Sequence, residues 1–235
     1  MQALIFAAGL GERMRPLTNH TAKPLLPVGG KPLIEWHLDN LSAMGVSDVV
    51  INISWLAEQF EPALGNGDRW GLRLHYSHEP YPPLETGGGM LNAWRLLDPT
   101  QPLLAINGDV WTDFAFGALA ALEPGQLAQL VMVDNPVHNA GGDFHFNGNG
   151  VLSSEGDPRL TFAGIGRYHP ELFADWSAHA EPTSRAADDL PRFKLAPLLR
   201  SAMQKGLVRG QHHAGRWTDV GTPERLAELD TQLRG

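Results

Sequence analysis

Glycine and basic residues near the N-terminus form a pattern that suits phosphate binding. The apolar run at residues 3–6 is typical of a buried parallel strand, and it leads directly into Ala7-Ala8-Gly9-Leu10-Gly11-Glu12-Arg13. Two glycines permit a tight backbone turn, and the exposed N–H groups of such a loop can cradle phosphate oxygens. The lysines and arginines among the first 34 residues are Arg13, Arg15, Lys23 and Lys31, although the whole chain has a formal charge of -8. The sequence therefore predicts a loop that binds a polyphosphate.

Two familiar phosphate motifs do not fit this loop. The dinucleotide fingerprint G-x-G-x-x-G requires a third glycine for close helix packing, but Met14 occupies that position. The pattern G-x-x-x-x-G-K-S/T of P-loop proteins also fails, because Gly30-Lys31 is followed by Pro32. The loop therefore belongs to neither class.

Two aspartates stand where a metal ion could be bound. An apolar run at residues 103–106 leads into Asn107-Gly108-Asp109, so Asp109 is expected at the same sheet edge as the first loop. Near the C-terminus, Thr222 can cap a helix that opens with Pro223, which leaves Asp219 exposed just before the cap. Mg²⁺ prefers a few carboxylates together with phosphate oxygens and waters. Taken alone, Asp109 is equally typical of a turn or a helix cap.

Composition limits the classes of protein that this chain can belong to. With 235 residues, 43% of them hydrophobic and 19% charged, the chain is long enough for one large α/β domain. The absence of cysteine excludes disulfides, thiolate metal sites and a cysteine nucleophile, and it fits a cytoplasmic protein. An acidic chain without an extended basic stripe is not expected to bind nucleic acid. No apolar run approaches the roughly 18 residues of a membrane span, and residues 3–10 lack the basic leader of a signal peptide.

The elements that must position these residues alternate between strand and helix. Helices are expected at residues 33–44, 56–64 and 90–97. Strands are expected at residues 48–53, 72–76, 103–106 and 130–133. This alternation predicts a parallel sheet with right-handed crossovers and a ligand site outside the carboxyl ends of its strands. Residues 141–150 predict a hairpin with an Asn-Gly turn, and residues 178–189 predict a mobile loop.

The N-terminal segments together resemble the signature of the sugar-1-phosphate nucleotidyltransferases. That signature is G-x-G-x-R followed by P-L-T and K-P-x-x-P, which the chain carries from Gly9 to Pro27. The resemblance implies an α/β fold with a Rossmann-like, mixed, mostly parallel sheet flanked by helices. It implies one domain over residues 1–235, in which residues 1–110 mainly bind nucleotide and residues 111–235 mainly bind sugar phosphate. Arg13 and Lys23 would be the catalytic cations at the triphosphate, within a nucleotide loop that includes Ala8, Gly9, Gly11 and Glu12.

A second glycine-rich segment resembles the part of the family that recognises the base. It runs from Glu79 to Gly89, and the resemblance assigns Glu79, Gly87 and Gly88 to nucleotide binding. The run Glu85-Thr86-Gly87-Gly88 departs at two positions from the Gly-Thr-Ala-Gly-like run of the family. The identity of the base therefore stays open, and an ordinary glycine-rich entry to a helix is the alternative.

The remaining site residues also follow from the resemblance. Asp109 and Asp219 correspond to the family's Mg²⁺ ligands, the latter within Trp217-Thr218-Asp219-Val220-Gly221-Thr222-Pro223. Asn107 and Asp143 correspond to sugar-hydroxyl contacts. A Glu-Lys-Pro element that binds the sugar phosphate in many relatives is absent. Arg192 and Lys194 are the candidates to replace it, and both are otherwise ordinary surface cations.

The activity implied is transfer of a nucleotidyl group from a nucleoside triphosphate to a sugar 1-phosphate. The short chain, the run Asn-Gly-Asp-Val-Trp-Thr-Asp-Phe and the missing Glu-Lys-Pro element resemble the bacterial N-acetylmuramate α-1-phosphate uridylyltransferases of peptidoglycan recycling, which use UTP. Mannose-1-phosphate guanylyltransferase and glucose-1-phosphate thymidylyl- or uridylyltransferase are the enzyme alternatives. A non-catalytic subunit that senses nucleotide sugars is the alternative from another class. Whether the protein is a monomer or a dimer stays open.

Overall fold

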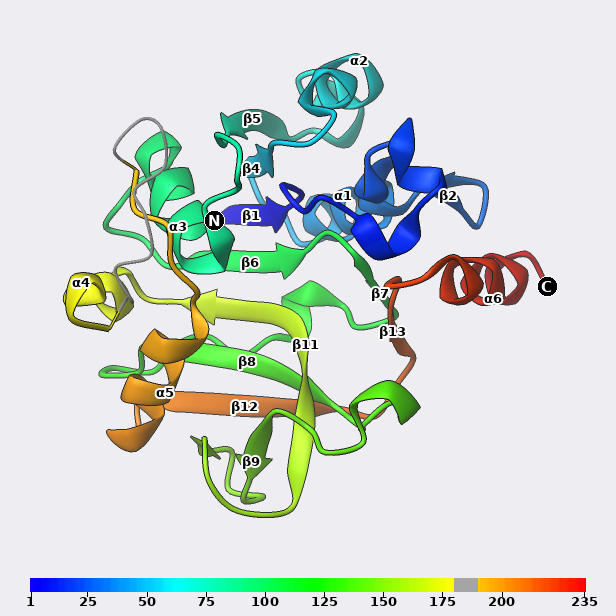
Figure 1. Ribbon diagram of the computed structural model, residues 1–235. Coiled ribbons are helices and arrows are strands. Elements are labelled where there is room, and N and C mark those ends of the chain that lie inside the picture. Colours follow the sequence, from blue (N-terminus) through cyan, green and yellow to red (C-terminus); the bar gives the residue numbers. More distant parts are fainter. Residues whose placement is uncertain (180–189) are drawn as a thin grey trace.

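A mixed β-sheet forms the centre of the molecule in a computed structural model, which describes residues 1–179 and 190–235 (Figure 1). Its first half consists of four parallel strands in the spatial order β6-β1-β4-β5. Their bounds are Gln2–Phe6 (β1), Asp48–Ile53 (β4), Arg73–His78 (β5) and Leu103–Asn107 (β6). All four therefore end at the same edge of the sheet, where ligands of α/β proteins bind.

A reversed strand joins the first half of the sheet to the second. β11 (Arg159–Tyr168) lies antiparallel to β6 and to β8 (Ala128–Val133), and β12 (Val208–His213) returns parallel to β8. The opposite arrows of β6 and β11 are visible in Figure 1. A hairpin of β9 (Phe144–Phe146) and β10 (Leu152–Ser153) pairs with the start of β11. The fold class predicted from the sequence, a mixed and mostly parallel sheet flanked by helices, is confirmed.

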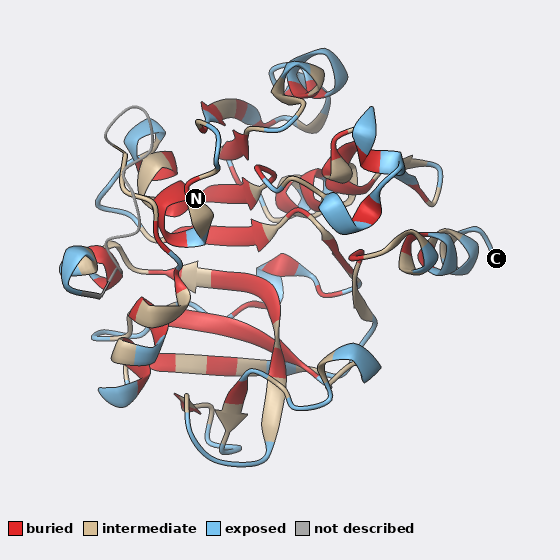
Figure 2. Ribbon diagram, viewed as in Figure 1, coloured by how far each residue is buried: buried red, intermediate tan, exposed pale blue. Residues whose placement is uncertain are grey.

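Helices cover both faces of the sheet because side chains alternate along its strands. In β1, Ala3 and Ile5 pack with α1 (Leu33–Ala43) and α2 (Phe60–Leu64), whereas Leu4 packs with the opposite cluster around α3 (Glu85–Ala93) and α5 (Ala196–Gln204). Figure 2 shows the strands buried between exposed outer surfaces of the helices. α4 (Trp176–His179) and α6 (Pro223–Arg234) complete the helices of the described residues.

A third apolar cluster ties the N-terminal loop to the C-terminal helix. It contains Met14, Trp111 and Leu226, and it lies beside two short sheets. In one of these, β7 (Val110–Thr112) pairs with β13 (Trp217–Asp219), and in the other, β2 (Pro27–Val28) pairs with β3 (Lys31–Pro32). The cluster brings three sequence motifs together that lie far apart along the chain.

Three local predictions need correction. The helix expected from residue 90 begins at Glu85, because the glycines before Met90 pack closely against other segments instead of forming a loop. The hairpin forms, but residues 147–151 connect its strands in place of a two-residue Asn-Gly turn. Residues 178 and 179 end α4, and the rest of the predicted mobile loop lies outside the described residues.

Among the described residues, no helix combines the length and the apolar character needed to cross a membrane.

Candidate active site

A cleft of about 640 Å³ opens at the carboxyl ends of the parallel strands. Most of the residues singled out from the sequence line it, namely Ala8, Gly9, Gly11, Glu12, Arg13, Lys23, Glu79, Asn107, Asp109 and Arg192. Asn52, Glu85 and Gly221 lie in its wall as well. Its volume is typical of sites for small molecules. The strand alternation therefore predicted the position of the cleft, and most of the residues assigned through the family resemblance lie in its lining.

The glycine loop offers a row of free hydrogen-bond donors. Within the part of the chain that the structure describes, the backbone N–H groups of residues 8–11 have no acceptor. Gly11 lies in the left-handed region, and a Cβ there would meet the Thr18 side chain at 2.8 Å. The Thr18 hydroxyl donates to the Gly11 carbonyl oxygen at 2.7 Å, which fixes the turn. Unpaired amides in a fixed turn are what an anion-binding loop requires.

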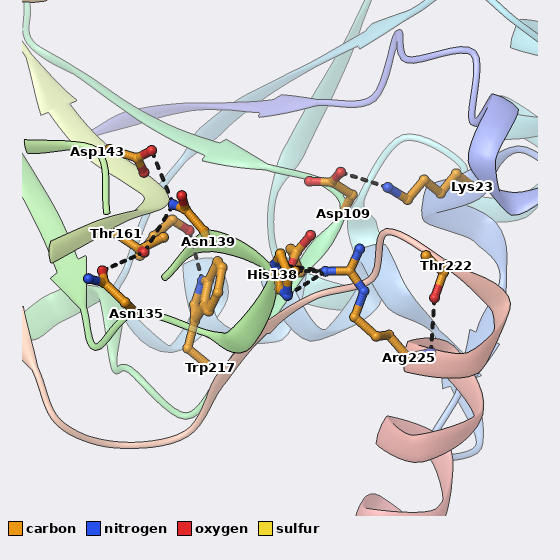
Figure 3. Close-up of polar contacts among 12 residues, drawn as sticks. Lys23, Asp109, Asn135, His138, Asn139, Asp143, Thr161, Trp217, Thr222 and Arg225 are labelled. Atoms are coloured by element: carbon orange, nitrogen blue, oxygen red, sulfur yellow. Dashed lines mark hydrogen bonds and ion pairs between the residues drawn. The ribbon is translucent and has the colours of Figure 1, made fainter. Parts of the chain in front are cut away.

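The two predicted catalytic cations differ in their surroundings. Arg13 is exposed and makes no hydrogen bond or ion pair with any described residue. Lys23 is mostly buried, and its Nζ lies 2.6 Å from a carboxylate oxygen of Asp109. Figure 3 shows these two side chains pointing toward one another. Arg13 is thus available to an incoming anion, whereas Lys23 is held at the aspartate.

A buried polar bridge joins the glycine loop to the second loop. The Asn52 side-chain oxygen accepts from the Ala7 N–H at 2.7 Å, and its Nδ2 donates to Glu79 Oε1 at 2.7 Å. Glu79 Oε2 accepts from the Leu84 N–H at 2.8 Å. Burial raises the pKa of Glu79, and these two hydrogen bonds oppose that rise. The bridge sets the position of the glycine loop relative to the segment that follows Glu79, and both line the cleft.

Gly87 and Gly88 do not lie at the cleft, contrary to the sequence-based assignment. Both are buried within α3, and their N–H groups donate to the Phe193 carbonyl oxygen. A Cβ on Gly87 would come within 2.4 Å of the Phe193 ring, and one on Gly88 within 2.3 Å of the Pro191 carbonyl oxygen. These glycines therefore allow two backbone segments to approach closely, and Glu85 and Thr86 at the start of α3 form the cleft wall instead.

Of the two cations proposed for the second phosphate, only Arg192 lines the cleft. Its Nε donates to the Pro83 carbonyl oxygen at 2.8 Å, and its guanidinium pairs with Glu85 at 3.0 Å. Glu85 has a φ of 63°, a conformation rarely adopted outside glycine. Lys194 is exposed and does not line the cleft, because it follows the buried Phe193 on the outer surface.

The two predicted metal ligands are neighbours through backbone pairing. β13 places Asp219 opposite Val110, and the Val220 N–H donates to the Asp109 carbonyl oxygen at 2.7 Å. Asp219 is not freely exposed as predicted. Arg225 lies 2.6 Å from its Oδ1 and His138 lies 2.8 Å from the same atom. Gly221 leaves room for the Arg225 side chain, because a Cβ at position 221 would lie 2.2 Å from the guanidinium.

The donor set around these aspartates fits Mg²⁺ better than a metal held by protein alone. No group of three or more His, Cys, Asp or Glu side chains suited to a metal occurs in the described parts of the chain. A metal at Asp109 and Asp219 would therefore take its other ligands from water and phosphate oxygens, as Mg²⁺ does at phosphoryl-transfer sites. Lys23 and Arg225 neutralise the two carboxylates in this structure.

The side of the site predicted to bind the sugar phosphate contains a hydrogen-bonded network. Asn107 ends β6 within the cleft lining. Asp143 lies outside that lining, where its carboxylate accepts from the Phe162 N–H at 2.8 Å and from Asn139 at 3.2 Å. Asn139 also donates to Thr161 at 3.1 Å, and Figure 3 shows this group beside His138 and Arg225. One short segment thus joins the predicted sugar contact to the predicted metal ligand.

Sequence reasoning missed Asn52, His138 and Arg225. Asn52 is a polar residue near the end of an otherwise apolar strand, level with Phe6 in the sheet. A single amide side chain in a buried strand needs hydrogen-bond partners, so Asn52 could have been predicted from the sequence as a structural or functional polar residue. Arg225 lies in the first turn of a helix, where a cation opposes the helix dipole. Nothing in the sequence places His138 beside Asp219, because the two lie far apart along the chain.

Comparison with known proteins gives consistent results. Residues 2–141 match the family model described as nucleotidyl transferase. The chain is 46% identical to an N-acetylmuramate alpha-1-phosphate uridylyltransferase from Neisseria meningitidis serogroup B, covering 97% of this chain and 96% of that one. It is 33% identical to the protein of the same name from Caulobacter vibrioides, covering 98% and 96%.

The fold also matches solved structures. A Bacillus anthracis protein described as a glucose-1-phosphate thymidylyltransferase and solved with a sucrose superimposes with a TM-score of 0.83, covering 100% of this chain and 95% of that one. The HddC protein of Yersinia pseudotuberculosis, complexed with GMP-PN, gives a TM-score of 0.74. Their identities to this chain are 20% and 17%, so these likenesses establish the fold alone.

Proposed function

Because this chain belongs to the nucleotidyl transferase family, we propose that it transfers UMP from UTP to N-acetylmuramate α-1-phosphate, yielding UDP-N-acetylmuramate and pyrophosphate. The observation that carries the proposal is one cleft that contains free loop amides, an unpaired Arg13 and the Lys23–Asp109 pair. The near full-length similarity to uridylyltransferases of that name supports the choice of substrates. A cytoplasmic role in recycling peptidoglycan sugars follows from those substrates.

The nucleotide would occupy the half of the cleft formed by residues 1–110. The amides of residues 8–11 and the Arg13 guanidinium hold the β- and γ-phosphates, which become the leaving pyrophosphate. Lys23 neutralises charge at the α-phosphate. The wall at Glu79, Glu85 and Thr86 faces the base, and there UTP would be distinguished from the other nucleoside triphosphates.

The sugar phosphate would enter from the half formed by residues 111–235. One of its phosphate oxygens attacks the α-phosphorus, a new P–O bond forms, and the bond to the β-phosphate oxygen breaks as pyrophosphate leaves. Asn107 in the cleft lining and Asp143 beside it orient the sugar, and Arg192, which also lines the cleft, binds its phosphate. Binding and orienting two mutually repelling anions can lower the activation barrier by about 7–11 kcal/mol. The reaction needs no covalent nucleophile.

A divalent metal ion would be held by Asp109 and Asp219. Mg²⁺ supplies charge stabilisation at the phosphate oxygens and helps to align the two reactants. Since both aspartates already carry a cationic partner, the side chains of Lys23 and Arg225 limit the net negative charge of the site before substrates arrive. We therefore expect activity to depend on added Mg²⁺ and to be lost with a chelator.

Pyrophosphate release with a panel of substrates tests the proposal. The purified protein is incubated with Mg²⁺, each of ATP, CTP, GTP, UTP and dTTP, and the 1-phosphates of N-acetylmuramate, mannose and glucose. Release with UTP and N-acetylmuramate α-1-phosphate, with UDP-N-acetylmuramate identified by mass, is the expected result. Turnover of mannose or glucose 1-phosphate instead would refute the substrate and keep the reaction class. No release with any pair would favour a nucleotide-sugar sensor, and light scattering of the same sample gives the oligomeric state.

A further inference from the structure

A second cavity lies at the edge of the sheet opposite the catalytic cleft. Its volume is about 500 Å³, and its lining includes residues at or next to the start of three parallel strands, Gln2 of β1, Asp48 of β4 and Leu104 of β6. Because the cleft lies at the carboxyl ends of these same strands, the full length of the strands separates the two sites. Ala121 and Leu122 form part of the remaining wall. The reaction proposed above makes no use of this cavity.

Arg167 lines this cavity, and its guanidinium has no partner among the residues that the structure describes. It lies on β11 directly opposite Leu104 of β6. Its Nε is buried and has no hydrogen-bond partner, and its guanidinium forms no ion pair with any described residue. Burial lowers the pKa of Arg167, as expected for a cation that has lost water without gaining an anion. Guanidinium groups in such places normally donate several hydrogen bonds, so the donors of Arg167 lack their usual acceptor.

The two carboxylate side chains of the cavity wall already accept hydrogen bonds. Asp48 accepts from Arg73 at 2.7 Å, and Asp98 accepts from the Thr100 N–H and hydroxyl. The Gln2 amide fixes the wall by donating to the carbonyl oxygens of Asp98 and Gln101 at 2.8 and 3.0 Å. Arg73 neutralises Asp48, whereas the Asp98 carboxylate has hydrogen-bond donors but no cation among the described residues. The Arg167 guanidinium is the positive charge of this pre-formed wall whose Nε lacks an acceptor among the described residues. The two nearby carboxylates would still repel a ligand with many negative charges.

We propose that this cavity binds a small organic anion whose phosphate or carboxylate group pairs with Arg167. A planar guanidinium binds either group through two parallel hydrogen bonds. Leu104 and Leu122 offer apolar contact to the rest of the ligand, and the volume suits a molecule of metabolite size. A triphosphate is disfavoured because Asp48 and Asp98 lie in the wall.

Titration of the arginine side chains by nuclear magnetic resonance tests the proposal on the full chain. Inorganic phosphate, acetate and metal-free UTP are added at constant ionic strength, and the Nε–H signal of Arg167 is followed. A saturable shift with phosphate, acetate or both is expected, and the effective probe identifies the acidic group. Arg95 is the matched control because it also lacks a described partner but is exposed. Its signal should shift only in proportion to the added salt.

Two variants extend the test. In Arg95→Gln the backbone amide of Leu104 should shift saturably with the effective anion, whereas in Arg167→Gln the affinity should fall by about tenfold or more. If Arg167→Gln does not fold, the wild-type Nε–H titration decides alone. A shift at Arg167 that never saturates and matches that of Arg95 would overturn the proposal. Tighter binding of UTP than of phosphate would overturn the choice of a small anion.

Discussion

Replacement of Asn52 by leucine tests whether the buried bridge positions the nucleotide. Leucine has the same branching and number of side-chain heavy atoms as asparagine, but it can neither accept from the Ala7 N–H nor donate to Glu79, which are both 2.7 Å interactions. Two buried polar groups then lose a partner, at about 1–3 kcal/mol each. The free energy of unfolding should fall by about 2–6 kcal/mol, which lowers Tm by about 4–24 °C in a chain of this size.

Function should suffer separately, because Ala7 is the residue from which the glycine loop departs. A loop displaced by about 1 Å can reduce kcat/KM for the nucleotide by about 10²-fold. The matched control is Asn40→Leu, since Asn40 also bridges two backbone groups, the Phe114 carbonyl oxygen and the Phe116 N–H, away from the cleft.

Urea unfolding measures the loss of stability. Steady-state kinetics, run well below the unfolding midpoints of both variants, measure the loss of function separately. Asn40→Leu should lose stability but keep the KM for UTP. If Asn52→Leu also kept that KM while losing stability, the bridge would only support the fold and the positioning argument would be wrong.

Four further perturbations give distinct results. Asp109→Asn should lower kcat by at least about 10²-fold without loss of secondary structure in circular dichroism, because one preorganised electrostatic contact is removed. Gly9→Ala meets no atom within 4 Å, so urea unfolding should change by less than about 0.5 kcal/mol while the KM for UTP rises. Gly88→Ala places a Cβ 2.3 Å from the Pro191 carbonyl oxygen and should cost about 1–3 kcal/mol of stability. Burial lowers the pKa of His37 from 6.5 to about 4. Between these pH values the imidazole is protonated in the unfolded chain and neutral in the folded chain. The free energy of unfolding should therefore fall by about 3 kcal/mol as pH drops through that interval, and His37→Leu should flatten the dependence.

The residues that sequence reasoning placed correctly owe their position to local structure. The glycine loop follows a short apolar strand, and Asn107 and Asp109 follow another, so the rule that ligands lie at the carboxyl ends of parallel strands was enough to bring them together. Thr222 caps α6 as expected, and its hydroxyl accepts from the Arg225 N–H. Each of these features is set within a few residues of the chain.

The features that sequence reasoning missed depend on segments distant in the chain. Gly87 and Gly88 were predicted to lie before the helix and to bind nucleotide, but they are helical because Pro191 and Phe193 pack against them. The same packing leaves Lys194 on the surface while Arg192 reaches the cleft. Low helix propensity predicts a loop only where tertiary contacts do not compensate for it, and no pattern within residues 79–90 announces those contacts.

The sugar-phosphate side of the site shows how a glycine distant in sequence can set the geometry of a site residue. Asn107 ends β6, and β11 pairs with β8 through a shift in register between Phe162 and Gly166. Gly164 lies within this irregularity with a φ of 73°, and a Cβ there would lie 2.6 Å from the Asn107 side-chain nitrogen. Any larger residue would both strain the backbone and push the Asn107 amide out of its place in the cleft wall. Gly164 therefore acts on the sugar-phosphate side of the site through Asn107, by leaving space for its side chain.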